Sequence, residues 1–122
     1  RQSYGLTPLQ WDGHLADLAR SHSQDMLSRN YFSHTTPEGT GTFQIIERDY
    51  AGRWRNMGEN IITTSGYPVN NIQAMAQHLV NQWMQSPGHR QNILTPDFTH
   101  TGVGIATYGN ELRGTQCFVR LQ

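Results

Sequence analysis

Two histidines lie in short segments of the kind in which functional sites are commonly built. His34 stands in Phe32-Ser33-His34-Thr35-Thr36-Pro37 and His89 in Ser86-Pro87-Gly88-His89-Arg90. Each segment is expected to follow a helix, and loops at helix ends on a rigid scaffold often carry binding and catalytic residues. Because 55 positions separate the two histidines, spacing alone does not place them in one site. Ser33 and Ser86 lie near them in sequence, which does not establish a nucleophile–base pair.

Glu59 is the third residue whose position suggests chemistry. It follows Met57-Gly58 and begins a segment rich in isoleucine and threonine that is expected to form a strand. A carboxylate at the start of a buried strand must be paired or lie in a cleft, because burying an unpaired charge is costly. A surface acid at the edge of the strand is the alternative, and the residues alone leave both interpretations open.

The other histidines and the single cysteine are better explained without chemistry. His14 and His78 fall off the apolar stripes of their expected helices, so we expect both to be exposed. His22 lies on such a stripe and is predicted to be a hydrogen-bonded core residue. His100 precedes a strand and is expected to lie outside a cleft. Cys117 lies within a β pattern, which favours a small buried side chain over a nucleophile.

Helical periodicity predicts the elements that must position these residues. We expect helices over Pro8–Ser28, with Thr7 as N-cap, over Phe43–Tyr50, with Thr42 as a possible cap, and over Asn71–Gln85. Ser86-Pro87-Gly88 should end the third helix, and a helical turn over His89–Leu94 can follow. The third helix has the strongest apolar stripe, which predicts that Trp83 is a core residue rather than a ligand-binding one; the stripe is formed by Ile72, Met75, Ala76, Leu79, Val80 and Trp83.

The β pattern lies around and after these helices. Residues Glu59–Thr64, Gly102–Ala106 and Thr115–Leu121 read as strands because they are rich in β-branched and aromatic residues. Gly109-Asn110 predicts the turn of a hairpin between the last two. Helices packed against a small antiparallel sheet, an α+β fold, are the expected result.

Composition excludes some partners. The 122 residues carry nine Arg, no Lys and nine acidic residues, so the formal net charge is zero. The cluster Arg48, Arg53 and Arg55 is offset by neighbouring acids and is expected to be a solvated loop, so nucleic acid is not expected as a partner. No run of 18 apolar residues exists, so no transmembrane segment is predicted. The chain begins at Arg1 without a Met, from which we expect that upstream sequence was removed.

Five motifs in order resemble the bacterial branch of the CAP superfamily: the cysteine-rich secretory, antigen 5 and pathogenesis-related proteins with their SCP-like extracellular domain. The resemblance covers about residues 6–121, and each motif taken singly has low specificity. The motifs are Leu9-Gln10-Trp11-Asp12 with His22-Ser23-Gln24-Asp25-Met26, Phe32-Ser33-His34, Gly58-Glu59-Asn60-Ile61, Trp83 with Ser86-Pro87-Gly88-His89-Arg90 and Asn92-Ile93-Leu94, and Gly102-Val103-Gly104.

The resemblance implies a three-layer α–β–α sandwich with a central antiparallel sheet. Residues 1–122 would then be one SCP-like domain from which part of the family's first helix has been cut off. It also implies that His34, Glu59 and His89 converge in an open cleft lined by Ser33 and Ser86. Members with two such histidines can hold a divalent cation, often zinc, so His34 and His89 are the implied metal ligands.

Two departures from the family pattern bear on that site. Eukaryotic members often have a second cleft glutamate where this chain has Ser86, so water must complete the metal's coordination and zinc should bind weakly. The family's disulfides are also absent, because Cys117 is the only cysteine.

Three functions fit the resemblance. The first is a secreted or extracytoplasmic binding module, expected as a monomer, that takes a divalent cation and a small, lipidic or peptide ligand. The second is a hydrolase in which Glu59 is catalytic and activates metal-bound water. The third is a structural extracellular module with a vestigial cleft.

Overall fold

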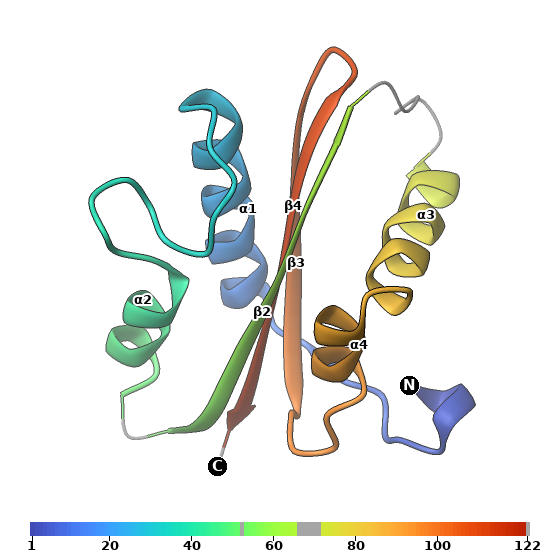
Figure 1. Ribbon diagram of the computed structural model, residues 1–122. Coiled ribbons are helices and arrows are strands. Elements are labelled where there is room, and N and C mark those ends of the chain that lie inside the picture. The colour runs from blue at the N-terminus through green and yellow to red at the C-terminus, as the bar shows by residue number, and fades with distance from the viewer. Residues whose placement is uncertain (52, 66–71, 122) are drawn as a thin grey trace.

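The computed structural model describes residues 1–51, 53–65 and 72–121 and has three layers (Figure 1). The helices are α1 (Gly13–Ser28), α2 (Thr42–Asp49), α3 (Ile72–Met84) and α4 (Pro87–Ile93), after a short 3-10 turn η1 (Gln2–Tyr4). The strands are β1 (Gln10–Trp11), β2 (Trp54–Ser65), β3 (His100–Tyr108) and β4 (Glu111–Leu121). Helices α1 and α2 cover one face of the sheet, and α3 and α4 cover the other. The expected α+β sandwich is confirmed.

The sheet is mixed rather than purely antiparallel as expected. Its strand order is β1-β3-β4-β2, and the three long strands pair antiparallel. The two-residue β1 pairs parallel to β3, with Gln10 opposite His100 and Trp11 opposite Thr101. The backbone N–H of Gln10 donates to the Thr99 carbonyl at 2.9 Å. Residues before position 13 thus use their hydrogen-bonding groups on the sheet edge, so the helix predicted from Pro8 begins later.

Asp12, and not Thr7, caps α1. The Asp12 carboxylate accepts from the backbone N–H groups of His14 (2.9 Å) and Leu15 (3.1 Å), which satisfies donors that the first helical turn leaves free. The predicted end of this helix at Ser28 agrees with the structure. Thr42 is likewise not a cap: α2 begins at Thr42 after Gly41, and no side chain caps it.

The Ser-Pro-Gly segment both ends one helix and begins the next. Helix α3 ends at Met84, and α4 begins at Pro87, where the fixed φ of proline suits a first helical turn. The predicted start of α3 at Asn71 lies outside the described residues. The helical turn predicted over His89–Leu94 is part of α4.

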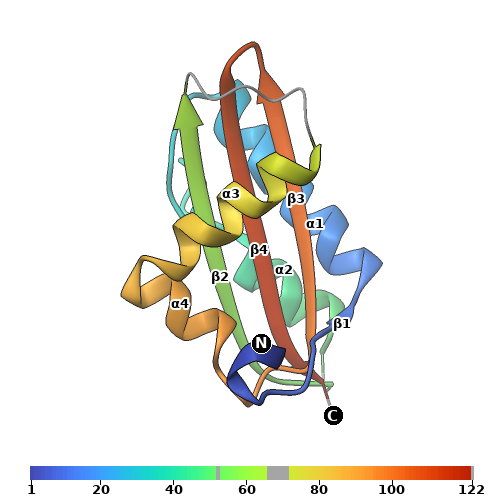
Figure 2. The same ribbon diagram turned by 90° about the vertical axis from the view of Figure 1, so that its right-hand side faces the viewer.

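β4 is buried along most of its length because helices cover both of its faces (Figure 2). The predicted hairpin is confirmed: Tyr108 pairs with Glu111, and Gly109 between them has a φ of +59°. All three long strands extend beyond the predicted bounds, since polar positions at their ends still pair.

The helices pack on the two faces at different distances. A Cβ on Gly104 would lie 2.0 Å from the backbone N of Arg20, and one on Gly102 would lie 2.2 Å from that of Ala16, so glycine lets α1 approach β3 closely. On the other face, Met75, Leu79 and Leu112 form the buried cluster under α3. Within the described residues, none of the helices has the length and hydrophobicity that a bilayer crossing requires.

Candidate functional site

Glu59 and His34 are in direct contact. Glu59 lies near the middle of β2, where strand alternation turns its side chain toward the α1 and α2 layer. The His34 ring bonds through Nδ1 to Glu59 Oε1 at 2.7 Å, and the Thr42 hydroxyl donates to Oε2. The Glu59 side chain is fully buried, whereas half of the His34 side chain is exposed. The carboxylate therefore holds the imidazole from below while the ring's other edge, with Nε2, stays available.

The loop that carries His34 is tied to α1. His22 Nε2 donates to the Ser33 carbonyl at 2.8 Å. Arg29 binds Asp25 at 2.7 Å and Glu38 at 2.6 Å, so it links the helix to the far side of the loop. These bonds fix the backbone on both sides of His34.

The protonation of His34 depends on Glu59. The hydrogen bond to Glu59 raises the pKa of His34 above its ordinary value, and partial burial opposes this rise only in part. A raised pKa favours the imidazolium, which forms an ion pair with the carboxylate. In the imidazolium Nε2 also carries a proton, and a cation that binds Nε2 would have to displace it first.

His89 lies in the first turn of α4, on the other side of β2. Its carbonyl accepts from Asn60 Nδ2 at 3.1 Å, and Asn92 Nδ2 donates to Asn60 Oδ1 at 2.9 Å and to the Glu59 carbonyl at 3.1 Å. Asn60 is fully buried. The residue after Glu59 therefore fixes α4 to the strand.

The His89 ring has a buried Nδ1 without a hydrogen-bond partner in the described part of the chain. Burial lowers the pKa of His89 below its ordinary value, and the charge of His34 lowers it further. His89 is therefore the more readily neutral imidazole of the two. A neutral ring with a free nitrogen is suited to bind a cation or to accept a hydrogen bond.

The two serines expected in the cleft have local contacts. Ser33 Oγ bonds to Thr35, accepting from its backbone N–H at 3.2 Å. Ser86 is the N-cap residue of α4, and its side chain makes no capping bond. The geometry joins His34 to Glu59, and the charge of His34 is one cause of the lowered pKa of His89. The role of the three residues, with Ser33 and Ser86, in one cleft stays a prediction.

No cluster of three or more histidine, cysteine, aspartate or glutamate side chains suited to a metal ion occurs in residues 1–51, 53–65 and 72–121. Glu59 spends both oxygens on His34 and Thr42, so the remaining donor set is two imidazoles. Two imidazoles alone would hold a cation only weakly, with water in its other positions and Glu59 orienting one ligand.

The predictions for the remaining candidates mostly agree with the structure. His22 is a buried, hydrogen-bonded core residue, and Cys117 is fully buried beside Glu59. His14 is half exposed, as expected, and contacts Asp49 at 2.6 Å. His78 is only half-buried rather than exposed. The sequence analysis did not predict that Thr42 is a partner of Glu59. It singled out Thr42 only as a possible cap of the second helix.

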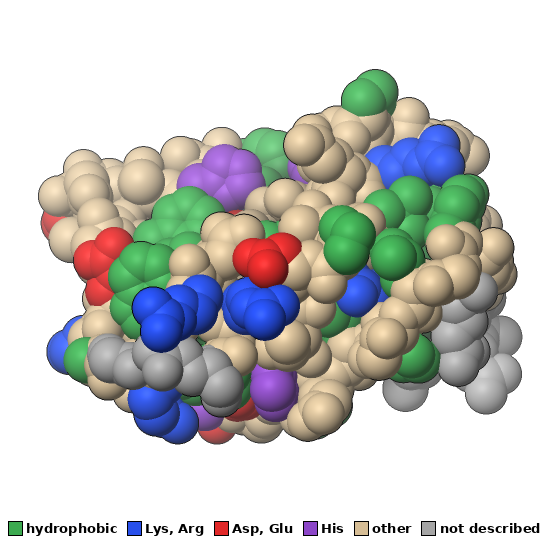
Figure 3. All heavy atoms as spheres, turned by 90° about the horizontal axis from the view of Figure 1, so that it is seen from below, with side chains coloured by type: hydrophobic (Ala, Val, Ile, Leu, Met, Phe, Trp, Pro, Cys, Tyr) green, Lys and Arg blue, Asp and Glu red, His purple; other side chains and the backbone are tan. Residues whose placement is uncertain are grey.

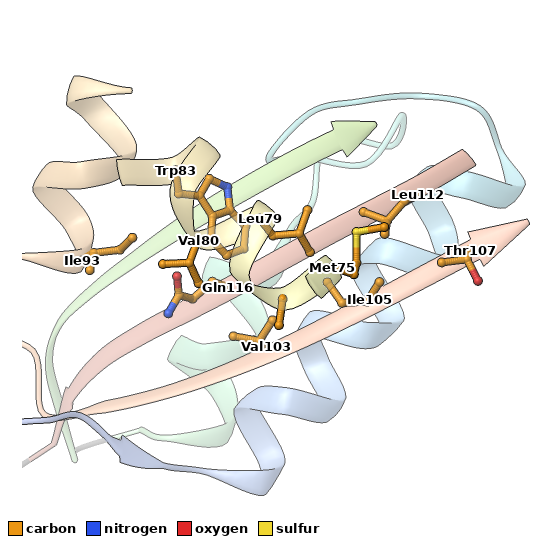
Figure 4. A pocket seen from close by; sticks show the side chains of 11 residues that line it. Met75, Leu79, Val80, Trp83, Ile93, Val103, Ile105, Thr107, Leu112 and Gln116 are labelled. Carbon is orange, nitrogen blue, oxygen red and sulfur yellow. The ribbon is translucent and has the colours of Figure 1, made fainter. Parts of the chain in front are cut away.

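A hollow lies on the opposite side of the sheet, between α3 and the strands β3 and β4 (Figure 4). Its volume is about 470 Å³, and nine of the eleven lining residues that the structure describes are apolar. Trp83 is 3% exposed and donates from Nε1 to the Ile61 carbonyl at 3.2 Å, so its predicted place in the core is confirmed. Its ring is also a wall of the hollow, together with Met75, Ala76, Leu79, Val80, Ile93, Val103, Ile105, Thr107, Leu112 and Gln116.

Charged side chains of both signs share the lower end of the molecule (Figure 3). Arg48 pairs with Asp49 at 2.8 Å, and Arg120 pairs with Asp97 at 3.2 Å. Arg53 lies over the Tyr50 ring, 5.0 Å from its centroid. The arginines are thus partly neutralised by neighbouring acids and do not form a continuous basic face there.

The fold and these motifs define the class of the protein. The model of the CAP family, described as the cysteine-rich secretory protein family, matches residues 1–119, and the chain belongs to this family. Among individual proteins, it is 40% identical to YkwD of Bacillus subtilis (strain 168) over 110 residues, which are 90% of this chain and 39% of YkwD.

Two solved structures share the fold. An extracellular protein containing an SCP domain from Bacillus anthracis str. Ames is 35% identical, with a TM-score of 0.72 over 98% of this chain and 36% of that one. An outer surface protein from Borrelia burgdorferi is 24% identical, with a TM-score of 0.78 over 100% of this chain and 84% of that one. The chain therefore spans well under half of YkwD and of the Bacillus anthracis protein.

Proposed function

We propose that this chain is an extracellular binding module whose hollow under α3 takes the hydrocarbon chain of a single-chain amphiphile. The observation that carries this proposal is the nearly continuous apolar wall of a hollow of about 470 Å³. That volume lies within the range of roughly 300–1,000 Å³ typical of small-molecule sites. Removing a hydrocarbon chain from water against such walls is favourable.

Gln116 and Thr107 are the polar residues in the described lining of the hollow, and Gln116 has an unsatisfied acceptor. Its Nε2 donates to Thr101 Oγ1 at 3.2 Å, whereas its Oε1 is buried and has no partner in the described residues. A buried acceptor without a partner is costly and gains from a donor. A neutral amphiphile with a hydroxyl head group, a long-chain alcohol, supplies both the hydrocarbon and the donor.

A titration with 1-dodecanol tests this function. In protein labelled at methionine methyl groups, we expect the Met75 signal, from the wall of the hollow, to shift on titration. The signal of Met26, a buried residue of α1 on the other face of the sheet, should stay in place. Ala76→Phe should block binding because its ring would fill the hollow. Ala51→Phe, at an exposed turn, should bind normally. An unmoved Met75 signal, or unchanged binding by Ala76→Phe, rejects the proposal.

We also propose that His34 and His89 hold a divalent cation, zinc being the chemical match, with Glu59 orienting His34. Two features support the rings as ligands: His89 Nδ1 has no hydrogen-bond partner among the described residues, and Glu59 already orients His34 through Nδ1. The CAP-fold protein NaASP2 was crystallised with Zn²⁺; it is 12% identical, with a TM-score of 0.62 over 93% of this chain and 60% of its own. A bound zinc ion would supply Lewis acidity to a ligand or water.

Calorimetry with zinc tests the cation site separately. We expect affinity on the order of micromolar at about pH 7.5 and much weaker binding at about pH 5.5, because protonated imidazoles do not ligate. His89→Ala should abolish binding, and Ser86→Glu should tighten it if the added carboxylate reaches the cation. No heat from the wild type at the higher pH would reject the metal proposal and favour a structural module.

The geometry supports an orienting role for Glu59 more than the catalytic role expected for it in a hydrolase. Both of its oxygens are engaged and its side chain is buried, so it is poorly placed to take a proton from water. Peptidase activity that zinc restores to metal-free protein would reverse this preference.

We propose further that residues 1–122 act as one monomeric domain outside the cytoplasm. The extracellular Bacillus anthracis relative supports the location. Fractionation of cells producing the natural protein would test the location, and light scattering of the purified chain would test its oligomeric state.

A further inference from the structure

A second hollow, polar where the first is apolar, lies between α1, α2 and the loop that joins them. Its volume is about 270 Å³. Ser21, His22 and Asp25 of α1 form one wall, Thr36 and Thr40 of the loop form another, and Thr42 lies at the start of α2. Leu18 and Ile45 add apolar surface.

The polar walls of this second hollow offer both acceptors and donors. Because a carbonyl only accepts, His22 Nε2 must carry the hydrogen in its bond to the Ser33 carbonyl, which leaves Nδ1 as an acceptor in the neutral ring. The Thr42 hydroxyl gives its hydrogen to Glu59 and can therefore only accept. The Ser21 hydroxyl can donate or accept, whereas the Thr36 and Thr40 hydroxyls bond to each other and have one hydrogen left between them to donate. A ligand matching this set must itself donate and accept at several points.

The charge in the hollow favours a neutral ligand. Asp25 is the acid in its wall, and Arg29 binds both of its oxygens, at 2.8 and 2.7 Å. This pairing lowers the pKa of Asp25 and offsets its negative charge locally. The attraction for an ammonium group is correspondingly reduced.

The hollow is held open by the same bonds that fix the loop. The Thr36 and Thr40 hydroxyls bond to each other at 2.9 Å, and the backbone N–H of Thr36 donates to the Thr40 carbonyl at 2.6 Å. Arg29 joins Glu38, between them, to α1. Walls that are already ordered reduce the entropy cost of binding.

We propose that this hollow binds a single neutral sugar ring. A sugar ring carries hydroxyls that both donate and accept around its rim, and it has C–H faces that can contact Leu18 and Ile45. The volume suits a ligand of that size, slightly below the usual range for larger molecules. This hollow shares no described lining residue with the apolar hollow, and neither His34 nor His89 is among its described lining residues. Its link to the histidine site is Thr42, whose hydroxyl donates to Glu59.

Amide NMR of ¹⁵N-labelled protein tests the proposal with D-glucose and N-acetyl-D-glucosamine as probes and ethanolamine as a cationic comparison. We expect saturable shifts at Ser21, Thr40 and Thr42 with a sugar, at dissociation constants on the order of millimolar. No saturable shifts with either sugar, or tighter binding of ethanolamine than of both, would overturn the proposal.

Two matched serine variants of α1 sharpen the test. Ser21→Ala should weaken sugar binding about fivefold through the loss of one neutral hydrogen bond. Ser28→Ala, also exposed on α1 but outside this hollow, should bind like the wild type. Both variants should keep the wild-type unfolding midpoint, since both residues are exposed. Equal binding by Ser21→Ala and Ser28→Ala would overturn the assignment to this hollow.

Discussion

The two faces of the sheet are packed in opposite ways. On one face, α1 approaches β3 so closely that Gly104 has no room for a methyl group. On the other face, α3 leaves a hollow of about 470 Å³ between itself and the same strand. The close face buries Glu59 among hydrogen-bond partners, and the open face is apolar. The difference teaches that one sheet can fix a polar constellation on one side and leave room for a ligand on the other.

Removing Trp83 should give the largest effect, because this side chain anchors α3 to the open face. We expect Trp83→Ala to lower the free energy of unfolding by about 3–5 kcal/mol, through lost burial and an enlarged cavity. Urea unfolding measures the change. Val80→Ala, at a half-exposed position on the same helix, should cost far less. Equal losses in the two variants would contradict the anchoring role.

Adding one carbon to each face of β3 should have opposite effects. Gly104→Ala forces a methyl group against the α1 backbone and should cost about 3 kcal/mol, since overpacking strains the helix. Val103→Ile adds its methyl group to the hollow and should be neutral or stabilising by up to about 1 kcal/mol. Thermal unfolding of the pair decides the matter. Similar losses at both positions would mean that the two faces are equally tight.

Asn60 joins the two faces, because it follows Glu59 and holds α4. Asn60→Ala should destabilise the fold by about 1–3 kcal/mol, since the His89 carbonyl loses the amide that donates to it and Asn92 Nδ2 keeps only the Glu59 carbonyl as acceptor. Asn81→Ala, which removes an exposed bond to Gln77 on α3, should change stability little. If the wild type binds zinc, the Asn60→Ala variant should still bind zinc at temperatures at which the variant is folded. A variant that lost zinc binding but kept wild-type stability would show that Asn60 is part of the site.

The smallest expected effects on stability are those of pH. His34 has a raised pKa, so its ion pair with Glu59 stabilises fully below the unfolded value of about 6.5, and this contribution is lost as pH rises through the folded value. His89 has a lowered pKa, so its contribution is present above about 6.5 and is lost as pH falls through its folded value.

Histidine NMR titration checks the two pKa directions. Glu59→Gln should bring the pKa of His34 down toward its ordinary value, because the carboxylate bond is its main cause. Glu38→Gln removes a carboxylate from the same loop that contacts Arg29 instead and should leave His34 unchanged. A His34 titration that Glu59→Gln does not move would contradict the contact.

The sequence by itself determined the layers of this protein and its candidate residues. Helical stripes and β-branched segments identified α1, α2, α3 and the three long strands, because local periodicity reflects which face each element buries. Ordered motifs singled out His34, Glu59 and His89. The predicted start of α1 was wrong because two features that the local pattern does not show decide it. These are the cap Asp12 and the pairing of β1 with β3, a contact across about 90 positions.

Only the tertiary structure decided what these residues contact. No local pattern indicates that Thr42 bonds to Glu59 or that Asn92 reaches the Glu59 carbonyl, since both contacts form between separate elements. The two hollows likewise cannot be predicted from the periodicity of the sequence, because they depend on how closely whole helices approach the sheet. Sequence patterns indicate which side of a helix or strand is buried. The distance between a helix and the sheet, and the residues that meet between them, are set only when the layers pack together.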